Sequence, residues 1–259
     1  MANDQIKRIG IIGYGTIGSY LVRKIGLEKD LSVVFVYDVL KEKLSALPPS
    51  LVIPSLEEAP ERKPDLVVEA AGQAWVKQHA ASFLEFTDLL IVSVGAFAER
   101  GLQERLETVG EAHRTRYYIS HGAIIGLDGV RDGREIIERV EITTVRPQEG
   151  YGLQERISKR TILYEGPTRK ACELFPHNVN VHASLALHGL GFDRTHSTVI
   201  ADPESKVMKH RIEIKGRGLE WHIDVESKPL GERTGAYVPE SIFQTVKRIC
   251  FQKFGMNLI

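Results

Sequence analysis

The chain has 259 residues, with 34 lysines and arginines against 34 aspartates and glutamates, and 42% of its residues are hydrophobic. This length and apolar content exclude a disordered or fibrous chain and predict two domains, or one large α/β unit, with enough core to fold unaided. The formal net charge of zero argues against nucleic acid or an anionic membrane as partner, because proteins that bind either usually carry a basic surplus. The composition therefore favours a small molecule.

The two cysteines, Cys172 and Cys250, indicate the compartment. They are too few for a disulfide framework or a zinc cluster and form no CxxC pair, so a reducing environment is expected. The first residues are polar and then strand-like, without an apolar leader, and the longest apolar run, 89–98, is too short to span a bilayer. We expect a cytoplasmic protein.

Short β-branched runs alternate with amphipathic stretches in the first half of the chain. Strands are expected over residues 8–12, 32–37, 65–69, 89–94 and 117–120. Helices are expected over residues 17–25 and 75–84. This alternation is typical of a doubly wound parallel sheet, and it predicts an α/β nucleotide-binding domain of the Rossmann type over residues 1–122.

After residue 122 the pattern changes to longer alternating strands, which predicts a second, α+β domain over 123–238 with a mixed or antiparallel sheet. Residues 207–215 and 220–226 alternate apolar and polar side chains around a turn through Gly216 and Gly218, so we expect a hairpin with one buried face. The tail, 239–254, starts with a proline and has apolar residues at helical spacing. We expect residues 239–259 to pack back on the first domain as a closing helix.

Gly13, Gly15 and Gly18 form a GxGxxG motif between the first strand and the first helix. In that position Gly13 permits a tight turn, Gly15 lets the backbone approach a pyrophosphate, and Gly18 allows close packing of helix and strand. The helix N-terminus, with Thr16 and Ile17, would face the anion. The motif predicts a dinucleotide site.

Asp38 lies 20 residues after Gly18, at the end of the second strand. A carboxylate there accepts hydrogen bonds from the adenosine ribose hydroxyls, which favours NAD as the cofactor. Lys41 nearby could accommodate a 2′-phosphate, so NADP stays open. The alternative is a plain tight turn, with Asp38 capping the next helix.

Two loops of the second half are candidates for the cofactor. Residues 120–128, Ser-His-Gly-Ala-Ile-Ile-Gly-Leu-Asp, leave a strand end, where ligands bind in doubly wound sheets, although a hinge between domains would look the same. Asn178 and Asn180 open a helical stretch after Pro176. Either asparagine could cap that helix or hold a nicotinamide carboxamide, and spacing alone leaves both open.

His210 differs from the other histidines because it lies on the apolar face of its strand, where a titratable group needs a hydrogen-bonding partner or a catalytic role. A core histidine satisfied by hydrogen bonds is the alternative. The sequence contains no Ser/His/Asp spacing of a known kind, no metal-ligand cluster and no GxxxxGK[ST] loop.

Six segments together resemble the L-aspartate dehydrogenase family over nearly the full length. They are GYGTIG at 13–18, VVEAA at 67–71, GAIIGLD at 122–128, YEGPTR at 164–169, FPHNVN at 175–180, and Ala-Asp-Pro at 201–203 with a histidine eight residues after the aspartate. The first segment is generic, whereas the last three, in this order and spacing, are specific to the family.

The resemblance implies a Rossmann domain and a substrate domain in a homodimer. It also implies NAD(P)-dependent oxidative deamination of L-aspartate to iminosuccinate or oxaloacetate and ammonia, or the reverse; bacterial members can supply iminosuccinate to NAD biosynthesis. The family's catalytic histidine corresponds to His210, which would take a proton from the amine or from the water that attacks the imine. The family's NAD-contacting alanine and asparagine correspond to Ala123 and Asn180. We also expect Ala70, Ala71 and Asn178 at the cofactor.

Several positions depart from the family pattern. Many members have Ser where this chain has His121-Gly122, Ala at His182, Asn at Met208 and an acid at Arg211. We expect His121, Gly122, His182 and Met208 to face the substrate, so a different amino acid or imine is an alternative substrate.

A dicarboxylate substrate also requires cations. The nearest basic cluster in the sequence is Lys159, Arg160, Arg169 and Lys170, although such clusters usually form solvated surface. A further alternative, from another class, is a dinucleotide-binding sensor without turnover, which Met208 and Arg211 favour.

Overall fold

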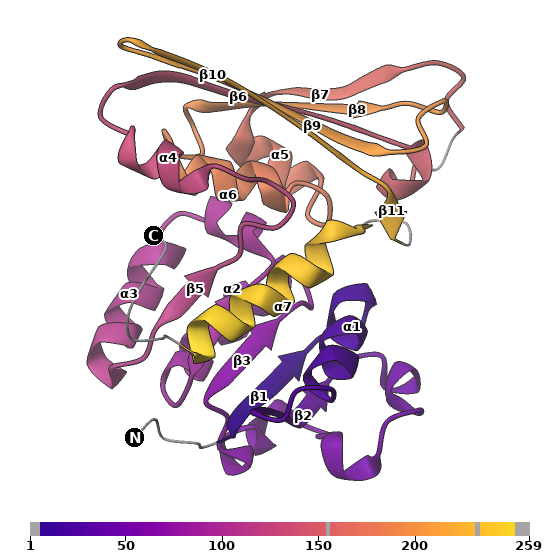
Figure 1. Cartoon of the computed structure of the whole chain (residues 1–259), viewed down its shortest axis with the longest axis vertical. Coiled ribbons are helices and arrows are strands. Elements are labelled where there is room, and N and C mark those ends of the chain that lie inside the picture. The colour runs from indigo at the N-terminus through magenta and orange to yellow at the C-terminus, as the bar shows by residue number, and fades with distance from the viewer. Residues whose placement is uncertain (1–5, 154–155, 231–233, 252–259) are drawn as a thin grey trace. The chain divides into compact units, whose positions relative to one another are not determined.

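The computed structural model describes residues 6–153, 156–230 and 234–251 (Figure 1). Contacts divide the chain into two compact units. The first comprises the chain up to Ser120 together with the segment from Ile242, and the second comprises His121–Ser241.

The first unit contains a five-stranded parallel sheet of order β2-β1-β3-β4-β5, which confirms the predicted doubly wound sheet. The strands are β1 (Lys7–Ile12), β2 (Leu31–Tyr37), β3 (Leu66–Glu69), β4 (Asp88–Ile91) and β5 (Tyr117–Ile119). The α-helices are α1 (Thr16–Ile25), α2 (Gln73–Leu84), α3 (Leu102–His113) and the greater part of α7 (Tyr237–Cys250). The 3₁₀ turns are η1 (Lys41–Leu44), η2 (Pro49–Leu51), η3 (Leu56–Glu58), η4 (Pro60–Arg62) and η5 (Val94–Ala98).

The strand order explains where a ligand can bind in this unit. From β1 the chain continues to β2 on one side of the sheet, whereas β3 leads to β4 and β5 on the other side. Adjacent strands whose connections diverge in this way leave a crevice at their carboxyl ends. The glycine motif follows β1 and Ala70 follows β3, so both lie at this point of the sheet.

The predicted strand 89–94 is too long, because β4 ends at Ile91. The backbone amides of Val92 and Ser93 donate to the Glu69 carboxylate, at 3.3 and 3.0 Å. This side chain therefore turns the backbone out of the sheet and into η5.

The second unit contains a five-stranded sheet of order β10-β9-β6-β8-β7. The strands are β6 (Ile137–Arg146), β7 (Thr161–Pro167), β8 (Thr195–Ala201), β9 (Met208–Gly216) and β10 (Leu219–Ser227). Only β6 and β8 pair in parallel among these neighbours, so the sheet is mixed, as predicted. The unit also contains α4 (Leu127–Asp132), α5 (Thr168–Leu174), α6 (Asn180–His188), η6 (Gln148–Tyr151) and the short pair β11 (Pro229–Leu230) and β12 (Thr234–Gly235).

One face of this sheet is covered and the other is open (Figure 1). Helices α4, α5 and α6 lie on the covered face. Leu127 and Val130 of α4 and Leu185 of α6 share a core there with Ile212 and Ile214 of β9. This face is the apolar side that the alternation predicted.

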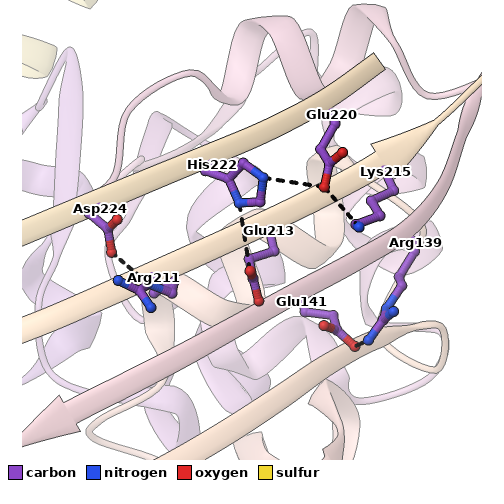
Figure 2. A network of polar contacts seen from close by, with 8 residues as sticks. All are labelled: Arg139, Glu141, Arg211, Glu213, Lys215, Glu220, His222 and Asp224. Carbon is purple, nitrogen blue, oxygen red and sulfur yellow. Dashed lines mark hydrogen bonds and ion pairs between the residues drawn. The ribbon is translucent and has the colours of Figure 1, made fainter. Parts of the chain in front are cut away.

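The predicted hairpin is confirmed by antiparallel pairing of β9 with β10, around a turn in which Gly218 has a φ of +76°. On β9 the side chains of Met208, His210, Ile212 and Ile214 are buried. On the open face, charged side chains of the two strands lie opposite one another (Figure 2), for example Arg211 opposite Asp224.

The closing helix α7 begins at Tyr237, two residues before the proline that marked its predicted start. Ile242, Phe243 and Val246 are buried, and Lys247 Nζ lies 3.1 Å from both carboxylate oxygens of Glu28. Its predicted end, residue 254, lies outside the described residues. Within those residues none of the helices is long and apolar enough to cross a membrane.

Candidate active site

The glycine turn of the first unit depends on two close approaches between backbones. A Cβ on Gly13, whose φ is +90°, would lie 2.5 Å from the Ala70 carbonyl oxygen. A Cβ on Gly18 would lie 1.9 Å from the Gly13 carbonyl oxygen. Only glycine permits such contacts, so these residues bring the start of α1, the end of β1 and the loop after β3 together.

The start of α1 is open to a ligand. Gly15 and Thr16 are exposed, Ile17 is half-buried, and a Cβ on Gly15 would meet no described atom within 4 Å. Gly15 is the N-cap and provides no side-chain cap for the first amides of the helix. Backbone N–H groups and the helix dipole together favour an anion here, so this turn fits the pyrophosphate of a dinucleotide.

Asp38 lies directly after β2 and is 8% exposed. Its Oδ2 accepts from the Tyr14 amide at 2.7 Å and its Oδ1 from the Leu40 amide at 2.8 Å, which ties it to the glycine turn. A carboxylate offers about four acceptor positions, so it retains capacity for ribose hydroxyls. The capping alternative is wrong, because the N-cap of η1 is Leu40; Lys41 is exposed on η1.

Ala70 and Ala71 continue from β3 at the same edge of the sheet, and the Glu69 side chain holds the backbone of Ala71 and Gly72. Its Oε1 accepts from the amides of Ala71 and Gly72, both at 2.8 Å, and from Ser93 Oγ at 2.8 Å. Burial raises the pKa of Glu69, and the hydrogen bonds from Gly72 and Ser93 limit that rise. Sequence reasoning did not single out this structural carboxylate.

In the second unit, the loop after Ser120 is tied to the start of α7. His121 is half-buried, with Nδ1 3.1 Å from the Ile124 carbonyl and Nε2 3.4 Å from Ser241 Oγ. Ser241 Oγ also donates to the Gly122 carbonyl at 3.0 Å. Ala123 is buried, 5% exposed.

The two predicted asparagines have different environments. Helix α6 begins at Asn180 with Val179 as its N-cap, so the capping alternative is wrong for both asparagines. Asn180 is half-buried, whereas Asn178 is buried and accepts from Arg146, Nη1 to Oδ1 at 3.3 Å and Nη2 to the backbone oxygen at 3.1 Å. The side chain of Asn178 therefore holds Arg146.

His210 lies in a buried polar cluster. Thr144 of β6 is paired with His210 of β9 in the sheet, and its Oγ1 lies 2.8 Å from His210 Nδ1 and 2.6 Å from His182 Nε2. His182 Nδ1 in turn lies 2.9 Å from Ser197 Oγ. His182 is fully buried and hydrogen-bonded through both nitrogens, which corrects the expectation that it faces the substrate directly.

Burial and, second, the positive charge of Arg146 lower the pKa of His210 from 6.5 to about 3. The pKa of His182 is lowered well below 6.5 by burial, by His210 and by Arg146. Both rings are therefore neutral at pH 7, and a neutral imidazole can accept a proton.

Arg146, at the end of β6, is a buried cation that sequence reasoning missed. Burial lowers its pKa, as expected for a charge removed from water. The signal was present in the sequence, because residues 137–146 alternate and place Thr144 and Arg146 on the side of Val140 and Ile142.

The basic cluster chosen from the sequence is at the surface. Lys159 and Arg160 are exposed, Arg169 pairs with Asp193 through Nε–Oδ1 at 2.6 Å, and Lys170 Nζ pairs with Glu173 Oε2 at 2.7 Å. Met208 is buried, and Arg211 pairs with Asp224 on the open face of the sheet. Among the described residues, no three His, Cys, Asp or Glu side chains gather to hold a metal ion.

Two family models match parts of this chain. A family model described as the NAD-binding domain of homoserine dehydrogenase matches residues 13–120, and one described as the C-terminal domain of aspartate dehydrogenase matches residues 128–249.

Relatives match almost the whole chain. The L-aspartate dehydrogenase of Methanosarcina acetivorans is 33% identical, covering 93% of this chain and 96% of its own. L-aspartate dehydrogenase 2 of Bordetella bronchiseptica is 34% identical, with the same 93% and 96% coverage. A crystal structure of aspartate dehydrogenase from Thermotoga maritima shares the fold, with a TM-score of 0.76 at 24% identity over 96% of this chain and 99% of that one.

The fold and the site define an NAD(P)-dependent oxidoreductase with a Rossmann domain and a separate mixed-sheet domain. Within that class, the chain belongs to the L-aspartate dehydrogenase family.

Proposed function

We propose that the protein catalyses the oxidative deamination of L-aspartate to iminosuccinate or oxaloacetate and ammonia, or the reverse reductive amination. The observation that carries this proposal is a neutral, buried His210 beside a buried arginine, in a chain of the aspartate dehydrogenase family. A base and a cation are the two groups that an acidic amino-acid substrate requires.

We assign the dinucleotide to the open start of α1. Gly13, Gly15 and Gly18 would shape the turn, and the amides near Thr16 and Ile17 would bind the pyrophosphate. Asp38 would bind the ribose, which favours NAD over NADP, beside the loop of Ala70 and Ala71. When bound, the dinucleotide supplies the two-electron acceptor or donor of the reaction.

In the second unit, we assign Ala123 and Asn180 to the nicotinamide end of the cofactor. Both follow family motifs, and Asn180 is half-buried at the first turn of α6. Asn178 stays in the proposed cofactor set through its side-chain NH₂ group, since its Oδ1 accepts from Arg146. His121 and Gly122 remain proposed substrate neighbours, and Arg160 keeps at most an outer role because it is exposed.

His210 is the proposed base. It would take a proton from the substrate amine during oxidation, or from the water that attacks the imine. Arg146 would attract a substrate carboxylate, and that negative charge would in turn offset the field that lowers the pKa of His210. Substrate binding would thus make the base stronger.

The test is NADH oxidation, followed at 340 nm, with oxaloacetate and ammonium, beside NADPH and a panel of other 2-oxo acids. Turnover with oxaloacetate well above the other acids is the expected result. Turnover with another acid only would replace aspartate as the substrate while keeping the reaction class.

The sensor alternative predicts tight NADH binding without turnover on any acid. Arg211, one of the two features that favoured it, pairs with Asp224 away from His210, so it gives that alternative no structural support.

We also propose a cytoplasmic homodimer. The family membership supports the dimer, and a sequence with two cysteines and no CxxC pair favours a reducing compartment. The mass of the protein in solution tests the oligomeric state.

A further inference from the structure

A chain of buried hydrogen bonds begins at a backbone carbonyl on β8. Thr168 Oγ1, at the first position of α5, lies 3.0 Å from the Thr195 carbonyl oxygen and 2.7 Å from Ser197 Oγ. Ser197 Oγ continues the chain to His182 Nδ1, at 2.9 Å.

The same chain ends at His210. His182 Nε2 lies 2.6 Å from Thr144 Oγ1, which lies 2.8 Å from His210 Nδ1. The five side chains come from five elements: α5, β8, α6, β6 and β9. Each is at most 3% exposed, so bulk water does not compete for these bonds, and each group must be satisfied by its neighbours.

The first hydrogen bond, from Thr168 to the Thr195 carbonyl, determines which group donates in every later one. A carbonyl oxygen can only accept, so the one hydroxyl proton of Thr168 points to Thr195. The 2.7 Å contact between the hydroxyls then requires Ser197 to donate to Thr168. With its only proton used, Ser197 must accept, so His182 carries its proton on Nδ1.

The same reasoning fixes the proton positions on His182 and then on His210. A neutral His182 has one N–H, so its Nε2 accepts the Thr144 proton. Thr144 Oγ1 has no second proton, and it must therefore accept from His210 Nδ1–H. The lone pair of His210 is left on Nε2. Burial and Arg146 keep both rings neutral, since they lower both pKa values.

We propose that Thr168, Ser197, His182 and Thr144 are positioning residues whose directed hydrogen bonds hold His210 in one tautomer, with Nε2 as the basic nitrogen. This inference rests on the proposed function, in which His210 is the base, and it assigns the basic position to one atom, Nε2. His182, expected from the sequence to face the substrate, acts through Thr144 instead.

The arrangement has a chemical consequence at His210. When Nε2 takes a proton, the Nδ1–H···Oγ1 bond to Thr144 is unchanged, so no group of the chain reorients during proton transfer. Passing the proton onward would require a charged His182, which burial opposes. The chain therefore orients the base without conducting its proton.

The first test is the two-bond ¹H–¹⁵N spectrum of the whole protein labelled in its histidine rings, at neutral pH without cofactor. His210→Asn and His182→Asn assign the signals. The expected result is a protonated Nδ1 and an unprotonated Nε2 on both rings. A protonated Nε2 on neutral His210 would overturn the proposal.

The second test removes a hydroxyl that does not touch His210. Ser197→Ala leaves His182 Nδ1 without its acceptor, so we expect His210 Nε2 to become partly protonated in the same spectrum. We also expect kcat to fall about tenfold while KM changes little, because the wrong tautomer cannot act as the base. Unchanged His210 signals in Ser197→Ala would contradict the directed chain.

Variants of β6 provide rescue and a matched control. Thr144→Ser keeps the hydroxyl, so the His210 signals and kcat should stay as in the wild type. Thr144→Val removes the hydroxyl, so the His210 signals should change and kcat should fall. Thr143→Val removes a hydroxyl from the neighbouring position, which is paired with Arg211 of the open face, and should change neither.

The two proposals fail separately. A protein with the expected His210 signals but no turnover on any 2-oxo acid would support the directed chain and overturn the proposed function. Turnover on oxaloacetate together with a protonated His210 Nε2 would support the proposed function and overturn the directed chain.

Discussion

The two faces of the hairpin β9–β10 hold histidines in opposite environments. On the open face, His222 lies between Glu213 and Glu220, at 3.6 and 3.3 Å, in a row of cross-strand ion pairs (Figure 2). On the covered face, His210 is 3% exposed. Its Nδ1 lies 2.8 Å from Thr144 Oγ1, and the positive charge of buried Arg146 lowers its pKa.

The difference shows that the number of polar contacts is a poor guide to their contribution to the free energy of folding or to catalysis. The open face has more of them, but water and salt screen each one. The covered face has few, and each acts in a medium of low dielectric, where an unsatisfied group is costly. We therefore expect the same substitution to have very different effects on the two faces.

The largest effect is expected from the two histidines themselves. His210→Asn should lower kcat by roughly 10²-fold or more, because it removes the proposed base, while NADH binding stays near that of the wild type. His222→Asn is the matched control and should leave kcat unchanged. Steady-state kinetics and an NADH fluorescence titration measure both, and equal effects of the two variants would refute the contrast between the faces.

The next largest effect is expected on kcat/KM when buried Arg146 is replaced, with Arg211 of the open face as the comparison. Arg146→Gln should lower kcat/KM by roughly 10- to 100-fold, the weight of hydrogen bonds to a charged group, mainly through KM for the dicarboxylate. It should also raise the pKa of His210, since a nearby positive charge is removed. Arg211→Gln is the control on the open face. If KM for oxaloacetate is the same in both variants, Arg146 has no part in substrate binding.

The pH dependence of stability tests the burial of His210. Its pKa is lower in the folded chain, about 3, than its ordinary value of 6.5, so between these values the unfolded state binds the proton. The free energy of unfolding should therefore fall as the pH is lowered below about 6.5, by up to about 1.4 kcal/mol per pH unit for this residue. Denaturant titrations of the wild type and His210→Asn measure this, and the variant should show the shallower slope. Parallel slopes would mean that His210 is not buried as a neutral ring.

The smallest effect is expected from the ion pair of Arg211 and Asp224. Arg211→Ala breaks it, yet the melting temperature and kcat should stay at their wild-type values, because both side chains are exposed, 64% and 65%. A clear loss of stability, removed by added salt, would show that the open face matters more than its exposure implies.

The sequence predicts the parts of this molecule that depend on local patterns. The glycine motif, Asp38 and the strands β1 to β3 follow from spacing within short segments, and the alternation of β9 places His210 on the buried face. The end of β4 was missed because it depends on Glu69, 24 residues before the amide of Ser93 that it binds.

The polar cluster around His210 could not be predicted in the same way. Thr144 lies 66 residues from His210 and 38 from His182, and only the register of β6 with β9 brings it to them. Arg146 was missed for a different reason. The alternation of residues 137–146 places it on the buried face, but an exposed basic pair at 159–160 is easier to see in a sequence than one arginine.

Glu69 has a consequence for the motions of the first unit. One carboxylate binds the amides of Ala71 and Gly72 after β3 and the amide of Ser93 after β4. Opening either loop would leave this buried carboxyl group with fewer hydrogen-bond donors, so we expect the two loops to open together. Their amides should therefore exchange hydrogen for deuterium at one common rate, as a single cooperative unit at the edge of the sheet that carries the glycine turn.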